Sequence, residues 1–156
     1  DVHAIPLDHI EAQLDAVFTD LNVQAVKIGM LANAEIIQLI ARKLRQYQPK
    51  HIVLDPVMVA TSGDLLLQQT AIQTLIDELL PLATLTTPNL PEAATLLNTN
   101  VPDSEQAVRE QIPALQQLGI GDSLLCYPMP TFLMPISPIR PRALGVLSSL
   151  AVGCST

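Results

Sequence analysis

The residues that could take part in chemistry gather in three short segments, and each segment directly follows a short apolar run. The segments are KIGM at residues 27–30, DPVM at residues 55–58 and TPNLPE at residues 87–92. Carboxylate, amide and hydroxyl oxygens of this kind bind Mg²⁺ and hydrogen-bond to charged ligands. The pattern therefore indicates a site for a ligand that carries negative charge and a cation.

The first two segments combine an apolar surface with a carboxylate. Gly29 permits the close approach of a ligand, and Met30 offers a soft apolar surface to a flat ring. Asp55 is well placed to hold Mg²⁺ beside phosphate groups, and the Thr-Ser-Gly-Asp stretch at residues 61–64 adds hydroxyls and backbone N–H groups. The alternative interpretation is a turn glycine, a core methionine and an Asx-type turn at Asp55.

The third segment also has two interpretations. Asn89 can cap a helix, with Pro91 in the first turn and Glu92 near the positive end of the helix dipole. Alternatively, Asn89 and Glu92 face a metal and phosphate site through water. One N-x-x-E pattern decides little, but three such segments in succession favour a binding site.

The periodicity of the chain predicts the elements that position these segments. Short β-rich runs at residues 25–28, 51–54 and 83–86 predict strands, and residues 123–125 could start a fourth. Helices are expected at residues 10–21, capped by Asp8 with Glu11, and after Asn33, and then at residues 70–80, 91–97 and 104–118. This alternation predicts an α/β fold with a mainly parallel sheet, whose strands end at the edge where ligands bind.

Length and charge exclude several classes of protein. The 156 residues suffice for one domain, and a net charge of −7 argues against nucleic-acid and anionic-membrane partners. We find no apolar run of transmembrane length and no signal peptide. Cys126 and Cys154 lack a metal-type spacing, so we expect free thiols and a cytoplasmic protein.

The composition changes after Gly121. Five of the 13 prolines lie between Pro128 and Pro141, and periodicity is lost. We therefore divide the chain into a domain at residues 1–120 and a Pro-rich apolar tail at residues 121–156. The first residue is Asp1 rather than Met, which suggests a segment of a longer reading frame.

Together, KIGML at residues 27–31, LDPVMVATSGD at residues 54–64 and TPNLPEAATLL at residues 87–97 resemble the hydroxymethylpyrimidine/phosphomethylpyrimidine kinases. The resemblance covers residues 1–120. It implies a three-layer α/β ribokinase-like fold, here incomplete at both ends. It also implies ATP- and Mg²⁺-dependent phosphorylation of hydroxymethylpyrimidine and its monophosphate in thiamine biosynthesis, and a homodimer.

The resemblance also implies roles for individual residues. Met30 would pack on the pyrimidine, with Val57 near it. Asp55, Asn89 and Glu92 would belong to the Mg²⁺ and phosphate network, with Asp55 and Glu92 as the metal-binding residues. Thr87 would lie close to the nucleotide phosphates. No catalytic residue is assigned within this segment.

The chain also departs from the family pattern. The Gly-rich substrate loop would precede residue 1, and Cys126-Tyr127-Pro128 stands where a Lys-Gly-Gly element is expected. Gly153-Cys154-Ser155 is at the wrong distance for the Gly-Thr-Gly anion hole, and Thr61 replaces a common lysine. A reading-frame shift near residue 125 would explain the tail. We therefore expect the truncated chain to be impaired or inactive.

Three alternatives remain open. The substrate could be pyridoxal, because each motif alone is shared with pyridoxal kinases. The chain could be a non-catalytic remnant. A receiver domain with Asp55 as phosphoacceptor is the third, but receiver domains need an acidic pair where this chain has Gly29-Met30.

Overall fold

A computed structural model describes residues 5–58, 66–118, 122–126 and 133–135 of the chain. The segment at residues 61–64 and most of the tail lie outside these residues. The strands form one sheet in the order β1 (Ala25–Ile28), β2 (His51–Leu54), β3 (Leu85–Thr86), β4 (Asp122–Cys126) and β5 (Leu133–Pro135). Strands β1 to β4 pair in parallel and β5 pairs with β4 antiparallel. The expected α/β class and mainly parallel sheet are therefore confirmed.

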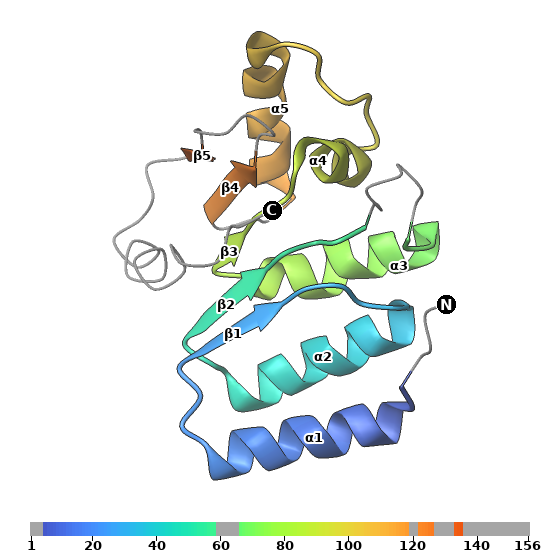
Figure 1. Ribbon diagram of the computed structural model, residues 1–156, viewed down its shortest axis with the longest axis vertical. Helices are drawn as coiled ribbons and strands as arrows, with labels where there is room; N and C mark the ends of the chain where they lie inside the picture. Colours follow the sequence, from blue (N-terminus) through green and yellow to red (C-terminus); the bar gives the residue numbers. More distant parts are fainter. Residues whose placement is uncertain (1–4, 59–65, 119–121, 127–132, 136–156) are drawn as a thin grey trace.

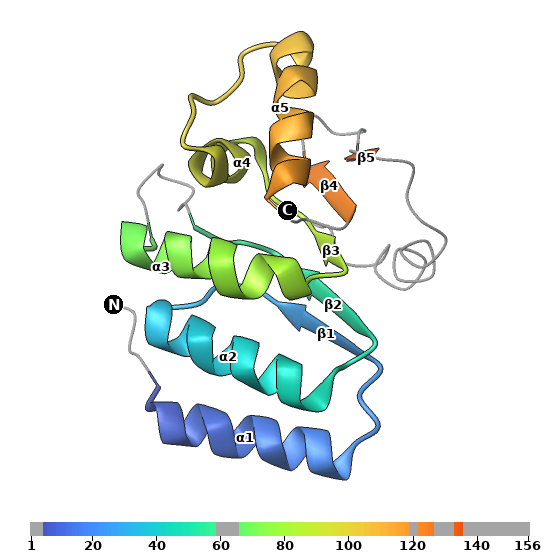
Figure 2. The ribbon, with the colours of Figure 1, turned by 180° about the vertical axis from the view of Figure 1, so that it is seen from behind.

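The helices are α1 (Leu7–Asp20), α2 (Ala34–Tyr47), α3 (Gln69–Thr74), α4 (Leu90–Leu97) and α5 (Glu105–Gln117). In Figure 1 the helices α2, α3 and α5 lie behind the strands, and in the reverse view of Figure 2 they lie in front of them. These helices therefore cover one face of the sheet. This arrangement is expected when crossovers of one hand connect parallel strands that follow each other in order across a sheet.

The core lies between the sheet and these helices. Ile28, Ile52 and Leu54 alternate along β1 and β2 toward this face, and each is at most 7% exposed. They pack with buried residues of α2 and α3 and of the turns that follow α3: Ile37, Leu44, Ile72, Leu75, Leu79 and Leu80. Among the described residues, no helix is long and apolar enough to span a membrane.

Most expected element boundaries are confirmed. Residues 25–28 and 51–54 are strands as expected, and the N-caps of α2, α4 and α5 are Asn33, Asn89 and Ser104. Each cap side chain accepts a hydrogen bond from a backbone N–H in the first turn, which satisfies a group that the helix itself leaves unpaired.

The start of α1 differs from the expectation. The N-cap is Pro6, which makes no side-chain cap bond, and Asp8 lies inside the first turn. Glu11 does not close a capping box with Asp8, because its carboxylate accepts hydrogen bonds from the Arg42 guanidinium of α2. A charged partner from a neighbouring helix has therefore replaced the local cap.

The helix expected at residues 70–80 is not regular throughout. It begins as α3, continues as a π-helical turn at Leu75–Leu79 and ends as a 3-10 turn at Leu80–Leu82. Pro81 lies in the last turn, where its missing N–H and fixed φ prevent a longer helix. The change in winding leaves Leu75, Leu79 and Leu80 all buried in the core.

Candidate active site

The three chemical segments meet at the carboxyl ends of β1, β2 and β3. The Asp55 N–H donates to the Ile28 carbonyl at 2.8 Å, and the Thr87 N–H donates to the Leu54 carbonyl at 3.0 Å. These bonds extend the parallel ladders by one step beyond the assigned strands. Gly29, Asp55 and Thr87 consequently lie side by side at the carboxyl ends of the three strands.

A proline follows two of these residues and explains their backbone conformation. Asp55 precedes Pro56 and Thr87 precedes Pro88, and both prolines are fully buried. A residue before proline is held in the extended region, and the proline itself cannot donate to a ladder. The sequence therefore ends each strand two residues before the proline and places a polar residue, Asp55 or Thr87, between them.

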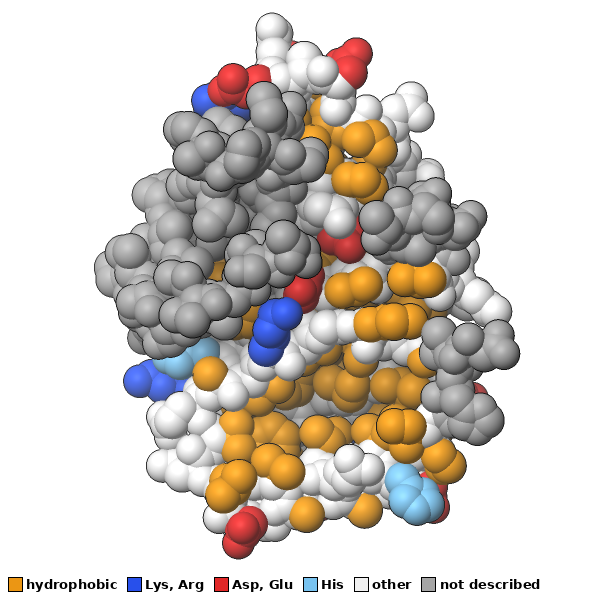
Figure 3. Space-filling view, in the orientation of Figure 1, with side chains coloured by type: hydrophobic (Ala, Val, Ile, Leu, Met, Phe, Trp, Pro, Cys, Tyr) orange, Lys and Arg blue, Asp and Glu red, His pale blue; other side chains and the backbone are white. Residues whose placement is uncertain are grey.

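Asp55 has a basic partner from the neighbouring strand. Its Oδ2 accepts a hydrogen bond from Lys27 Nζ at 3.0 Å. The Asp55 side chain is 31% exposed and that of Lys27 is 56% exposed, so this ion pair remains accessible to solvent and to ligands. In Figure 3 a basic side chain lies beside acidic side chains near the middle of the face opposite α2 and α3.

Asn89 and Glu92 form a complete capping box at the start of α4. The Glu92 N–H donates to Asn89 Oδ1 at 2.9 Å, and the Asn89 N–H donates to Glu92 Oε2 at 2.9 Å. The helix-capping interpretation of this segment is therefore confirmed. A capping role does not remove Glu92 from this cluster, because the charge of Asp55 also acts on its carboxyl group.

Glu92 is a buried carboxylate with an acidic neighbour. It is 3% exposed, and burial raises the pKa of its carboxyl above the usual value. The backbone N–H groups of Asn89 and Met58 oppose this rise in the pKa, whereas the negative charge of Asp55 adds to it. The charge of Asp55 next to this buried carboxyl creates an environment that a divalent cation would stabilise.

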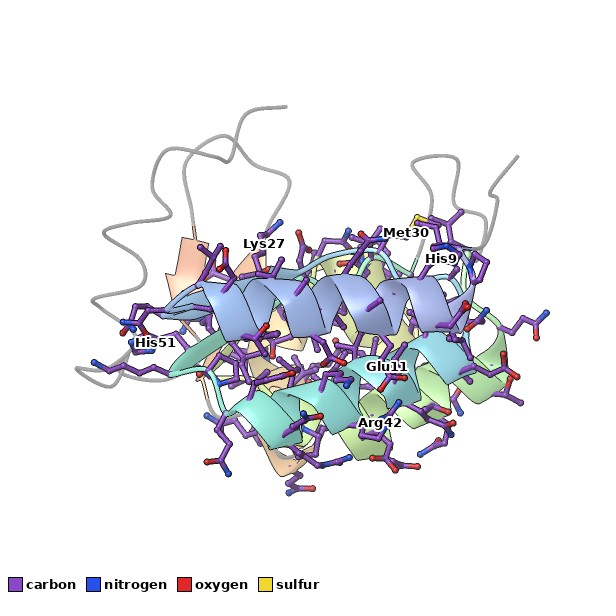
Figure 4. The ribbon with its side chains drawn as sticks, turned by 90° about the horizontal axis from the view of Figure 1, so that it is seen from below. His9, Glu11, Lys27, Met30, Arg42 and His51 are labelled. Atoms are coloured by element: carbon purple, nitrogen blue, oxygen red, sulfur yellow. The ribbon has the colours of Figure 1, made fainter. Side chains whose placement is uncertain are left out.

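The two expected ring-binding residues, Met30 and Val57, each lie close in sequence to a strand end. Met30 follows Gly29 and is 44% exposed, which is unusual for a large apolar side chain. Figure 4 shows Met30 and Lys27 directed to the same side of the molecule, opposite to Arg42. Val57 is half-buried, and its N–H donates to the Asp55 carbonyl at 2.8 Å. Met30 is thus accessible to a ligand rather than part of the core.

Gly29 borders open space. A Cβ built at this position would meet no atom within 4 Å apart from its chain neighbours. Packing within the described structure therefore does not explain the glycine. A ligand that approaches the backbone beside Asp55 would explain it.

An apolar cavity of about 230 Å³ lies on the other side of β1, between α1 and α2. Its lining residues include Leu14, Phe18, Val26, Lys27 and Gly29. Asp55, Thr87, Asn89 and Glu92 do not line it. The cavity therefore adjoins the strand-end cluster through Lys27 and Gly29.

The carboxylates of the cluster could hold a hard cation such as Mg²⁺ only together with oxygen atoms of water or of a bound ligand. Among the described residues, no group of three or more His, Cys, Asp or Glu side chains could hold a metal ion. Asp55 and Glu92 provide two carboxylates, and Glu92 already accepts backbone hydrogen bonds from Asn89 and Met58. Mg²⁺ is commonly held by one or two carboxylates together with water and substrate phosphates, so the cluster fits this mode of binding.

The comparisons with known proteins agree with this geometry. Residues 1–125 match the family described as phosphomethylpyrimidine kinase. The chain belongs to the phosphomethylpyrimidine kinase family. It is 46% identical over 124 residues to the hydroxymethylpyrimidine/phosphomethylpyrimidine kinase of Escherichia coli (strain K12), covering 80% of this chain and 47% of that protein. The enzyme of Rhizobium meliloti (strain 1021) is 48% identical over 118 residues, covering 76% of this chain and 44% of that protein.

Solved structures of this family and of related vitamin kinases share the fold. The phosphomethylpyrimidine kinase of Clostridium difficile 630 matches with a TM-score of 0.75 and 34% identity, over 86% of this chain and 58% of that one. The pyridoxal kinase of Bacillus subtilis, solved as an ADP complex, matches with a TM-score of 0.74 and 34% identity, over 81% and 48% of the two chains. The ribokinase-like fold expected from the resemblance is confirmed. The chain spans about half the length of the curated relatives it matches.

One side chain of the polar cluster at the strand ends, that of Lys27, was not identified from the sequence. Lys27 belongs to the first motif, but only its motif and not its side chain was assigned a role. The alternation of side chains along β1 was the available signal, because Lys27 and Gly29 fall on the same face. Its partner Asp55 is 28 residues away and is brought to it by the pairing of β1 with β2.

Proposed function

We propose that this chain carries the metal- and phosphate-binding centre of an ATP-dependent kinase that phosphorylates hydroxymethylpyrimidine and its monophosphate in thiamine biosynthesis. The observation that carries the proposal is the alignment of Gly29, Asp55 and Thr87 at one sheet edge, with the Asn89–Glu92 capping box next to it. The names of the relatives at 46% and 48% identity support the same activity and substrate.

Each residue has a distinct proposed role. Asp55 would hold Mg²⁺ directly, and Glu92 would contribute through water, because backbone N–H groups already engage its carboxylate. Thr87 and Asn89 would lie beside the nucleotide phosphates at the start of α4. In phosphoryl transfer the protein mainly positions groups and neutralises charge on the transferred phosphoryl, and this cluster is suited to both tasks.

Met30 and Val57 would form the pyrimidine surface. An exposed methionine beside a charged cluster can stack on a flat heteroaromatic ring while the polar groups hold the phosphate end. Pyridoxal is the second candidate substrate, because the pyridoxal kinases of Bacillus subtilis and Staphylococcus aureus, solved with ADP, AMP-PCP or pyridoxal, match this fold. Both substrates are flat rings that carry a hydroxymethyl group, so the described residues are compatible with either.

We further propose the division into a kinase part at residues 1–120 and a tail at residues 121–156. Its support is the change in composition at that point and a family match that ends at residue 125. β4 follows this boundary and still pairs with β3. A cytoplasmic homodimer with a small-molecule partner, and with neither nucleic acid nor membrane as partner, completes the proposal.

The experiment measures ADP formation and ligand binding together. The 156-residue chain and a full-length relative are assayed with ATP and Mg²⁺ in the presence of hydroxymethylpyrimidine or pyridoxal. We expect the relative to use hydroxymethylpyrimidine, and this chain to bind MgADP in calorimetry even where its turnover is low. Asp55→Asn should abolish that binding. Turnover with pyridoxal alone would favour the second candidate, and absence of MgADP binding would refute the proposed centre.

Gly29→Ala tests the site without disturbing the fold. The added methyl meets no protein atom, so stability should be unchanged or rise by up to about 1 kcal/mol through the unfolded chain. The same methyl should intrude on a ligand beside Asp55 and weaken binding of MgADP or pyrimidine. Unchanged affinity for both ligands would place them away from this edge of the sheet.

A further inference from the structure

Lys27 is the described basic residue that pairs with a strand-end carboxylate. It is the third residue of β1, and the parallel register places it beside Val53, two residues before Asp55. Its Nζ lies 3.0 Å from Asp55 Oδ2. The other described ion pairs of Lys and Arg lie within a helix or join two helical segments, as in Arg42–Glu11, Lys43–Asp15, Arg45–Glu78 and Arg109–Glu105.

The Lys27–Asp55 ion pair contributes little to the stability of the fold. Both side chains are substantially exposed, and exposed ion pairs contribute little to stability because water screens and solvates both charges. The two strands are already joined by their backbone ladder, which the Asp55 N–H bond to Ile28 extends. The pairing of Lys27 with Asp55 therefore points to the ligand site rather than to the core.

Charge balance shows what Lys27 can do there. Asp55 and Glu92 bring two carboxylates to the cluster, and Lys27 brings one positive charge, so the cluster is short of cationic charge without a ligand. A divalent cation bound to the Asp55 carboxylate would lie beside the Lys27 ammonium, which contacts Oδ2 of the same carboxylate, and the two positive charges would repel each other. The ammonium and the metal therefore compete for Asp55, and a metal that binds there releases the ammonium.

The released ammonium needs an acceptor. Lys27 has a flexible stem, and Figure 4 shows it on the same side of the molecule as Met30, where the ligand is expected. A phosphate oxygen next to the metal is the acceptor that restores charge balance, since an ammonium pairs strongly with phosphate. Metal and phosphate would then favour each other's binding, because the phosphate compensates the ammonium that the metal displaces.

We propose that Lys27 is a positioning residue that holds Asp55 in the absence of ligand, competes with a divalent cation for it, and moves to a phosphate group when metal and nucleotide bind together. This inference rests on the proposed function. It adds a coupling between metal and nucleotide: free metal binds weakly, and metal with a nucleoside polyphosphate binds well.

The test compares Lys27→Met, Lys27→Arg and Lys50→Met in the 156-residue chain. Lys50 is exposed and directly precedes β2, at the opposite end of the strand from Asp55, so Lys50→Met controls for the lost charge. Two affinities are measured by calorimetry: Mn²⁺ without nucleotide, as a probe of the metal site, and ADP in excess Mg²⁺. Urea unfolding checks that each variant is folded.

We expect Lys27→Met to bind free Mn²⁺ more tightly by roughly fivefold, as the removal of one nearby charge in a solvated site predicts. The same variant should bind MgADP more weakly by about tenfold, because a charged hydrogen bond to phosphate is lost. Lys27→Arg should retain wild-type affinities, and Lys50→Met should change neither by more than about twofold, since an exposed and distant charge is screened. Opposite shifts in the two affinities are the signature of the exchange.

Other outcomes overturn the inference in distinguishable ways. If Lys27→Met matches Lys50→Met in both affinities while Asp55→Asn abolishes metal binding, Lys27 has no such role and the proposed function stands. If Lys27→Met weakens Mn²⁺ binding, Lys27 only supports the shape of the site and does not compete with the metal. If the unaltered chain binds neither Mn²⁺ nor MgADP, the proposed function fails and this inference fails with it.

Discussion

The ammonium of Lys43 in α2 lies 2.7 Å from Oδ1 and 2.9 Å from Oδ2 of Asp15 in α1. Glu11 approaches the same ammonium at 2.8 Å, and the Tyr47 hydroxyl donates to Asp15 Oδ1 at 2.8 Å. Phe18 stacks on Tyr47 with their ring centroids 4.7 Å apart. Because α1 contains no fully buried residue, this network is a main attachment of α1 to the rest of the fold.

Lys43→Met should loosen α1 more than Arg42→Met does. The Lys43 side chain is 5% exposed and faces two carboxylates, whereas the Arg42 side chain is 57% exposed and pairs with Glu11 alone. Removing Lys43 leaves Asp15 without a cationic partner and Glu11 with Arg42 alone, and it removes the least exposed charge of the network. Hydrogen exchange of the α1 amides measures the effect. Equal exchange in the two variants would show that the network does not hold the helix.

The attachment of α1 should weaken in acid. Hydrogen bonds from Arg42 and Lys43 lower the pKa of Glu11 from 4.5 to about 2, and Lys43 and Tyr47 lower the pKa of Asp15. An acid with a lowered pKa in the folded state stabilises the fold above its unfolded pKa, and this stabilisation disappears as the pH falls through the folded value. We therefore expect α1 exchange, corrected for its intrinsic rate, to increase between about pH 4.5 and pH 2. In Lys43→Met this pH dependence should be smaller, and an identical profile would contradict the assignment.

Thr86→Val should stabilise the protein. The Thr86 hydroxyl is fully buried in β3 and has no hydrogen-bond partner among the described residues. Replacing it with a methyl group removes an unsatisfied polar atom, for an expected gain of about 1 kcal/mol in the free energy of unfolding. Thr84→Val is the matched control, because Thr84 Oγ1 accepts the Ile52 N–H at 3.1 Å and its loss should cost about 1 kcal/mol. Urea unfolding measures both, and a destabilised Thr86→Val would show that the hydroxyl has a partner.

Asn33→Ala and Asn89→Ala separate helix capping from ligand binding. Each asparagine caps its helix with a 2.9 Å hydrogen bond, so each substitution should cost about 1 kcal/mol in the free energy of unfolding. Only Asn89 lies at the proposed phosphate site, so only Asn89→Ala should also weaken MgADP binding. Calorimetry at a temperature where both variants are folded makes the comparison. Equal affinities would reduce Asn89 to a structural cap.

The local sequence was sufficient to predict where the strands end and where most helices begin. The β-rich runs at residues 25–28 and 51–54 became strands because their β-branched residues favour a pleated sheet and Pro56 stops the second. Asn33, Asn89 and Ser104 cap helices because a short polar side chain can satisfy free N–H groups within the same turn. The start of α1 was predicted wrongly, because Glu11 found a partner on another helix.

Only the tertiary structure determined which charged side chains form ion pairs. Lys27 reaches Asp55 and Lys43 reaches Asp15 across 28 residues in each case, and neither pair has a local signature. The first pair depends on the register of two parallel strands, since a slip of one residue would turn Lys27 to the other face. The second depends on how α1 packs against α2. The sequence therefore determined where the polar groups stand along each element, and the packing of elements determined which of them face each other, because only packing brings residues distant in sequence within hydrogen-bond distance.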